Sequence, residues 1–185
     1  LGGSTTTLNS DTDYQFNEEV QGFQVEERGG EENAENLVNL VRAIYSHTSQ
    51  NTGETFVIID EAHNILRQKK GREALEQFVR EARDTQTSVV MISQNADDFA
   101  SNLEGRNILK NLEATFLMRH SEVAEDVIDF FQLSTQETTE LQKLKTGTKS
   151  DYSEALMKIT DRLDSKVQIT ATPTEYSTIT EGDGE

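Results

Sequence analysis

Two adjacent carboxylates, Asp60 and Glu61, directly follow the apolar run at residues 56–59. The run is aromatic and β-branched without a polar interruption, which predicts a strand buried on both faces. At the end of such a strand, nucleotide-hydrolysing motors use one acid to hold the Mg²⁺ of the nucleotide, through water, and the next to polarise the attacking water. The structural alternative is that Asp60 begins a turn and Glu61 lies in the first turn of a helix, where the dipole favours negative charge.

The phosphate-binding loop that normally accompanies such a pair is absent. No segment matches G-x-x-x-x-G-K-[ST], whose backbone N–H groups and lysine hold the phosphates. The chain begins at Leu1 without an initiating methionine, so we expect it to be the C-terminal part of a longer protein that carries the loop. Loss of the loop from an intact protein is the alternative. If it is part of a longer protein, we expect this chain alone to bind nucleotide weakly and not to turn it over.

The composition is strongly acidic. The 185 residues include 34 acidic and 17 basic side chains, a net charge of −17. Such a surface repels nucleic acid unless basic residues are locally concentrated. Because the acids are spread through the chain, we favour adaptation to high salt, where screening removes the self-repulsion, over an acidic partner-binding face.

Cysteine and long apolar segments are both missing. Without cysteine, disulfides, thiol catalysis and zinc thiolate sites are excluded. No apolar run approaches the roughly 20 residues of a membrane span. An intracellular location fits these absences, and we expect any association with a membrane to come through partners.

Apolar periodicity predicts three regions along the chain. Residues 1–32 are polar and Gly-rich and predict an extended or irregular lead-in, residues 33–172 form an α/β domain, and residues 173–185 are an acidic tail. Helices are predicted where Leu37, Leu40, Val41 and Ile44, and later Leu75, Phe78, Val79 and Ala82, recur at helical spacing, with a short helical stretch at Ile108 and Leu109.

The second half of the chain predicts two capped helices and a hairpin. Ser121 is the expected cap of a helix whose apolar face ends at Phe131. Ser134 and Glu137 have the spacing of a capping box, and that helix is expected to end at Gly147. Residues 155–159 and 166–170 are expected to pair around a turn at 161–165.

Further buried strands are predicted at residues 88–93 and 114–118. Strands alternating with helices indicate an α/β sandwich with a mostly parallel sheet, in which ligands bind at the carboxyl ends of the strands. Asp60, Glu61, Gln94 and Arg119 all follow such strands. We therefore expect these four side chains to converge, although each alone is more often a strand-end cap.

One basic run stands out in the acidic chain, at residues 67–72. Its cations are Arg67, Lys69, Lys70 and Arg72. It is either a solvated loop or a contact with nucleic-acid phosphates or a neighbouring subunit.

The ordered segments resemble a known family, the conjugative or type IV secretion ATPases of the VirB class (TraC/TraE-like), within the HerA/FtsK group of RecA-like motors. The similar segments are residues 55–63 (TFVIIDEAH), 80–83 (REAR), 89–94 (VVMISQ), 107–111 (NILKN), 133–147 and 174–180, together with the opening Leu1-Gly2-Gly3. The resemblance implies a RecA-like three-layer sandwich with a C-terminal β-hairpin, here lacking the phosphate-loop portion. It also implies ATP and Mg²⁺ as ligands, a hexameric ring of identical subunits, and a cytoplasmic location, docked through partners of a membrane-bound transfer apparatus on the inner face of the membrane.

The resemblance assigns roles to individual residues. Asp60 would position Mg²⁺, Glu61 would activate water, and Gln94 would sense the γ-phosphate. Arg83 and, as a second candidate, Arg119 would act as arginine fingers for a ring neighbour; a helix C-terminal arginine is the alternative for Arg83. His63 would orient Glu61 or contact substrate, with a packed helix residue as the favoured alternative.

Three functions remain open from the sequence. The first is the Walker-B and sensor half of an ATPase that powers conjugative DNA or protein transfer. The second is a HerA/FtsK-like DNA translocase or viral packaging motor, favoured if the basic run faces a ring pore. The third is a non-catalytic RecA-like interaction module that has lost the phosphate loop.

Overall fold

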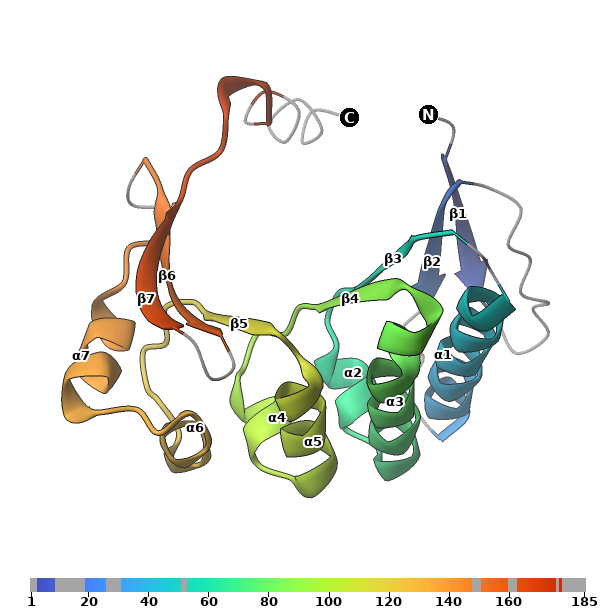
Figure 1. The fold of residues 1–185 in the computed structure, drawn as a ribbon, viewed down its shortest axis with the longest axis horizontal. Coiled ribbons are helices and arrows are strands. Elements are labelled where there is room, and N and C mark those ends of the chain that lie inside the picture. Colours follow the sequence, from blue (N-terminus) through green and yellow to red (C-terminus); the bar gives the residue numbers. More distant parts are fainter. Residues whose placement is uncertain are drawn as a thin grey trace. The chain divides into compact units, whose positions relative to one another are not determined.

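The computed structural model describes residues 3–8, 19–25, 31–50, 53–147, 151–159, 163–175 and 177 (Figure 1). The chain divides into two compact units, Leu1–Asn111 and Leu112–Glu185. Residues 1–2, 9–18 and 26–30 of the expected lead-in, and the acidic tail apart from residues 173–175 and 177, lie outside the described residues.

The first unit contains parallel strands and a layer of helices. Its elements are β1 (Gly3–Leu8), β2 (Val20–Val25), α1 (Glu31–Gln50), β3 (Thr55–Ile59), α2 (His63–Leu66), α3 (Lys69–Ala82), the 3₁₀ turn η1 (Arg83–Thr85), β4 (Thr87–Met91), α4 (Asp97–Ala100) and α5 (Leu103–Asn111). Strand β1 pairs in parallel with β2, and β3 pairs in parallel with β4. The helices predicted from Leu40 and from Phe78 are confirmed as α1 and α3.

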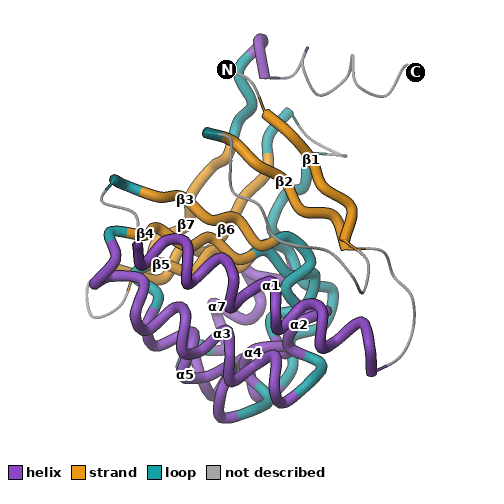
Figure 2. Tube along the Cα trace, turned by 90° about the vertical axis from the view of Figure 1, so that its right-hand side faces the viewer, coloured by secondary structure: helices purple, strands orange, loops and turns teal. Residues whose placement is uncertain are grey.

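The core of this unit lies between the helices and one face of β3 and β4. Helix α3 packs between α1 and α5, and its Leu75 and Phe78 are almost fully buried, as is Ile108 of α5. Tyr45 of α1 meets the Phe78 ring edge-on, with 6.2 Å between centroids. Figures 1 and 2 show the helices of this unit on one side of the β3–β4 pair. This layer of helices fixes where both strands end.

The strands themselves are less buried than their sequences predict. Phe56 and Ile58 of β3 are 66% and 60% exposed, and Val90 and Ile92 along β4 are 38% and 49% exposed. The expectation of strands buried on both faces is therefore wrong for the described residues. The physical reason is that the helices cover only one face of the pair, so alternate side chains, which point to opposite faces, remain open.

The basic run forms a helix junction and not a loop. Arg67 is the C-cap of α2, Gln68 is the N-cap of α3, and the helix begins at Lys69. The junction is tight at Gly71, where an added Cβ would lie 2.2 Å from the Ile65 carbonyl oxygen. Only glycine allows the first turn of α3 to approach α2 this closely.

The second unit is an antiparallel sheet with two helices. Its elements are β5 (Ala114–Leu117), α6 (Glu125–Phe131), α7 (Thr135–Lys143), β6 (Ser153–Ile159) and β7 (Leu163–Ile169). Strand β6 pairs antiparallel with both β5 and β7. Leu117, Val127, Leu141 and Ala155 form its core. The predicted hairpin is thus confirmed, and the α/β class with a parallel part and a C-terminal hairpin is confirmed with it.

Two details of this unit correct the sequence predictions. Helix α6 begins at Glu125 with Ala124 as its N-cap, so Ser121 does not cap it. Helix α7 ends at Lys143, and Gly147 lies in a turn beyond it, where its N–H donates to the Ser153 hydroxyl at 2.9 Å. The predicted capping box of Ser134 and Glu137 is confirmed at the start of α7.

Candidate active site

Polar side chains from two neighbouring strands meet at the carboxyl ends of β3 and β4. The strands are in parallel register, Ile59 opposite Met91, so the residues that follow them share one edge. There the Gln94 side-chain amide donates to Glu61 Oε1 at 2.8 Å. The convergence expected from the sequence is present for these two residues, which are 33 positions apart.

The turn after β3 has a defined and strained backbone. Glu61 has φ of 49°, the left-handed region that residues other than glycine, asparagine and aspartate rarely adopt. The Asp60 Oδ1 accepts the Glu61 N–H at 2.8 Å, and the Ala62 N–H donates to the Ile92 carbonyl at 2.8 Å. Strain of this kind persists only where surrounding contacts enforce it and often marks a functional site.

The Asp60 carboxylate is exposed beside this turn. The described residues contain no group of three or more His, Cys, Asp or Glu side chains placed to hold a metal ion. Mg²⁺ commonly binds one or two carboxylates, keeps several waters and takes its remaining ligands from phosphate oxygens. An exposed single carboxylate such as Asp60 fits that mode of binding.

The other carboxylate oxygen of Glu61 faces a histidine. His63 Nδ1 lies 3.0 Å from Glu61 Oε2, and the side chains are 16% and 43% exposed, respectively. Among the described residues, neither of these two atoms has an aligned hydrogen-bond partner. The contact arises because α2 begins at His63, directly after the turn. From the sequence, a packed helix residue was the favoured interpretation of His63.

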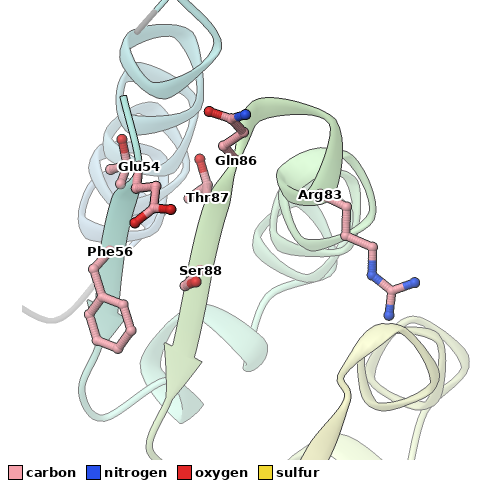
Figure 3. A pocket seen from close by; sticks show the side chains of 7 residues that line it. Glu54, Phe56, Arg83, Gln86, Thr87 and Ser88 are labelled. Carbon is pink, nitrogen blue, oxygen red and sulfur yellow. The ribbon is translucent and has the colours of Figure 1, made fainter. Parts of the chain in front are cut away.

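Arg83 lies at the opposite end of the same strands. It lines a hollow of about 560 Å³ with residues from the start of β3 and β4: Glu54, Thr55, Phe56, Gln86, Thr87 and Ser88. Figure 3 shows Arg83 pointing away from these strands, and its Nη2 donates to the Asn111 carbonyl at 3.5 Å. The length of a five-residue strand, about 16 Å, separates this end from Glu61. Arg83 and Glu61 are therefore not brought together within this chain.

Arg119, the remaining predicted site residue, belongs to the second unit. Its Nε donates to the Gln142 carbonyl at 3.2 Å, and the neighbouring His120 Nδ1 lies 2.8 Å from the Met118 carbonyl. Both contacts are to backbone within that unit.

The basic residues at the α2–α3 junction are of two kinds. Arg72 is 19% exposed; its Nη1 donates to the Leu66 carbonyl at 2.8 Å, and its Nε lies 3.5 Å from Glu104 Oε2. A backbone hydrogen bond within Glu104 and the nearby Arg72 charge lower the pKa of that carboxyl. Lys69, by contrast, is 72% exposed and only 3.7 Å from Glu73 within the same helix. Arg72 is thus part of the fold, whereas Lys69 faces solvent.

Comparison with known proteins identifies similar chains. The model of a family described as "AAA-like domain" matches residues 24–161. Among solved structures, VirB4 of Thermoanaerobacter pseudethanolicus is similar with a TM-score of 0.68 and 20% sequence identity, over 88% of this chain and 44% of the VirB4 chain. This chain therefore spans less than half of that protein. No curated protein sequence matches. At the level of the fold, the similarity to VirB4 confirms the resemblance to VirB-class ATPases seen in the sequence.

Proposed function

Because this chain belongs to the AAA-like domain family, we propose that it is the Walker-B and sensor half of an ATPase that powers transfer through a type IV secretion-like apparatus. The observation that carries the proposal is the 2.8 Å hydrogen bond between Gln94 and Glu61 at the carboxyl ends of β3 and β4. Ligands of open α/β sheets bind at this edge. An acid and an amide joined there match the two roles that nucleotide hydrolysis requires.

The two residues have complementary chemistry. The Glu61 carboxylate can only accept hydrogen bonds at neutral pH, so it orients an attacking water and takes its proton. The Gln94 amide both donates and accepts, so it can contact a phosphate oxygen and the water together. Asp60 would hold Mg²⁺ through water, and that ion would neutralise charge developing on the phosphates of ATP.

The missing phosphate loop would come from the rest of a longer polypeptide. The exposed apolar face of β3 and β4, formed by Phe56, Ile58, Val90 and Ile92, supports this proposal. Aligned apolar side chains of this size are usually covered in a stable protein. We propose that the phosphate-loop-bearing part of the same polypeptide covers them, and the match to only 44% of VirB4 is consistent with such a missing part.

The arginines would act between subunits of a hexameric ring. The length of the strands, roughly 16 Å, separates Arg83 from Glu61, so Arg83 cannot reach the phosphate bound beside Glu61 of the same chain. In a ring it would approach a neighbour's nucleotide and stabilise the transition-state charge. Arg119 is the second candidate for that role. Its observed contact is to the Gln142 carbonyl.

The transfer apparatus would hold the protein at the inner face of the membrane from the cytoplasmic side. Partners in that apparatus would supply the attachment. Among the described residues no helix is both long and apolar enough to span a bilayer. Similarity to VirB4 supports secretion or conjugation as the process that the ATPase powers.

Two alternatives follow from specific observations. Exposed Lys69, together with Arg67 and Lys70, would suit DNA contacts of a HerA/FtsK-like translocase or viral packaging motor. Arg72 is excluded from that set because its guanidinium is bound internally. The absence of a phosphate loop from the sequence favours the other alternative, a non-catalytic interaction module.

The proposal is tested by measuring ATP hydrolysis by the longer protein that contains both this chain and the phosphate loop. The assay is run at high salt because the chain carries a net charge of −17. Wild type is compared with Glu61→Gln, which keeps the shape and removes the base. We expect Glu61→Gln to bind nucleotide and to lose at least 100-fold in kcat. Equal turnover, or none in either protein, favours the interaction module.

A further inference from the structure

His63 and Glu61 present buried atoms to each other that have no other partner. Glu61 Oε2 and His63 Nδ1 are 3.0 Å apart, and both atoms are inaccessible to water. Within the described part of the chain, neither makes an aligned hydrogen bond to any group. A buried polar atom without a partner costs about 1–3 kcal/mol, so this juxtaposition needs a reason.

The backbone of the turn after β3 holds these two side-chain atoms close together. Glu61 occupies the left-handed region, and the buried Ala62 that follows it donates its N–H to Ile92 on β4 at 2.8 Å. The Asn64 N–H donates to the Glu61 carbonyl at 3.0 Å and closes the turn that begins α2. The imidazole is thus carried by a turn that is anchored to the neighbouring strand.

Gln94 completes the surroundings of the carboxylate. Its amide donates to Oε1 at 2.8 Å, while His63 faces Oε2 at 3.0 Å. With one neighbour at each oxygen, the carboxylate is restricted in its orientation. A carboxylate held in this way keeps the geometry that water activation needs, and a displacement of about 1 Å can cost about 100-fold in rate.

We propose that His63 is a positioning residue, whose Nδ1–H donates to Glu61 Oε2 and fixes the carboxylate that activates water. This inference rests on the proposed ATPase function. A carboxylate offers only acceptors, so the proton must be on Nδ1 for the pair to bond. The proposed role requires this N–H to align on Oε2 when Glu61 activates water. His63 itself contacts neither water nor phosphate in this role.

Three substitutions of His63 separate positioning from simple packing. The side-chain amide nitrogen of His63→Asn lies near the place of Nδ1, that of His63→Gln lies near Nε2, and His63→Ala has no donor. In the protein that carries the phosphate loop, we expect His63→Ala and His63→Gln to lose about 10-fold or more in kcat, with KM and nucleotide Kd unchanged. His63→Asn should remain within about threefold of wild type. His47→Ala, an exposed histidine of α1, is the control.

A spectroscopic measurement on this chain tests the contact without any activity. Nitrogen NMR shifts of the neutral His63 ring report which nitrogen carries the proton. We expect the Nδ1–H tautomer in wild type and a shift toward Nε2–H in Glu61→Ala, since the acceptor is gone. An Nε2–H ring in wild type, or a ring unaffected by Glu61→Ala, overturns the proposal.

The kinetic outcomes separate the two proposals. The ATPase proposal stands if wild type hydrolyses ATP and Glu61→Gln does not. Even then, the positioning role is wrong if His63→Ala is as fast as wild type, or if His63→Asn is as slow as His63→Ala. If Glu61→Gln is as active as wild type, the ATPase proposal fails, and with it the catalytic purpose of the contact. In the Glu61→Gln background, His63→Ala should add no further loss.

Discussion

The Gln94 amide donates to Glu61 Oε1 at 2.8 Å, which links the acid after β3 to the amide after β4. The residue suited to sensing a phosphate is therefore the one that holds the residue suited to activating water. The amide nitrogen carries two N–H groups, so Gln94 can hold Glu61 with one and donate to a ligand oxygen with the other. Occupancy of the phosphate site and orientation of the base would then be coupled through one amide.

Shortening Gln94 should disrupt this coupling. In the protein with its phosphate loop, we expect Gln94→Asn to lose 10- to 100-fold in kcat, because the amide no longer reaches Glu61 or the phosphate. Nucleotide Kd, measured with a fluorescent analogue, should change less than about threefold. Gln136→Asn shortens an exposed amide on α7 and serves as the control. A Gln94→Asn enzyme with normal kcat would show that the contact is structural.

Much of the site could be predicted from the sequence because its residues directly follow apolar runs that can be recognised as strands. An apolar run that ends in Asp60-Glu61, and another that ends before Gln94, define two strand ends, and parallel pairing brings such ends together. Arg119 follows β5 in the second unit, so its place beside these residues stays a prediction. Strand β5, which precedes it, pairs with β6 within the second unit, and no local pattern specifies which strand a neighbour will be.

Burial was the property least accessible to sequence reasoning. Phe56 and Ile58 have the composition of a strand covered on both faces, but only one face of β3 is covered within the described residues. Composition reports how apolar a strand is and not which elements are present to pack on it. The internal role of Arg72 was missed for a similar reason, since a charge run gives no sign of which cation will find a backbone carbonyl.

Two helix glycines should be intolerant of alanine. A Cβ at Gly71 would lie 2.2 Å from the Ile65 carbonyl oxygen, and one at Gly105 would lie 2.2 Å from that of Phe99. Alanine would otherwise gain about 1 kcal/mol in a helix. Here the clash with backbone should exceed that gain, so we expect either substitution to lower the free energy of unfolding by about 1–3 kcal/mol.

Urea unfolding of Gly71→Ala and Gly105→Ala measures this effect. Gly147→Ala is the matched control, because its Cβ would lie 3.3 Å from a side-chain oxygen, that of Ser153, which can move. We expect the control to change stability by less than about 0.5 kcal/mol. A Gly71→Ala variant as stable as wild type would contradict the close approach of α2 and α3, and a Gly105→Ala variant as stable as wild type would contradict that of α4 and α5.

The Arg72 guanidinium should be required for stability where Lys69 is not. Arg72→Gln leaves the Leu66 carbonyl without its 2.8 Å donor and removes the partner of Glu104. We expect a loss of about 1–3 kcal/mol, which for a chain of this size lowers Tm by several degrees. Lys69→Gln, at a side chain that is 72% exposed, should leave Tm unchanged. Equal Tm values for the two variants would contradict an internal role of Arg72.

Glu137 should make stability depend on pH in the acid range. Hydrogen bonds from the Ser134 hydroxyl and N–H, together with Lys158 of β6 at 2.9 Å, lower the pKa of Glu137 from 4.5 to about 2. A pKa lowered in the folded state gives stability that is complete above pH 4.5 and is lost as the pH falls toward 2. The shift sets an upper bound of about 3 kcal/mol, which solvent at this 25% exposed side chain reduces.

Glu137→Gln isolates this contribution. We expect wild type to be more stable than Glu137→Gln by about 1–3 kcal/mol at about pH 7, and this difference to shrink by roughly 1 kcal/mol at about pH 3.5, measured by urea unfolding. Glu140→Gln, an exposed carboxylate on the same helix, should show no such dependence. As the pH falls, Glu137 takes up its proton in the unfolded chain before it does so in the folded chain. The difference must therefore shrink because wild type loses stability, and not because Glu137→Gln gains it. A difference that is constant with pH would mean that the Glu137 charge is not what joins α7 to β6.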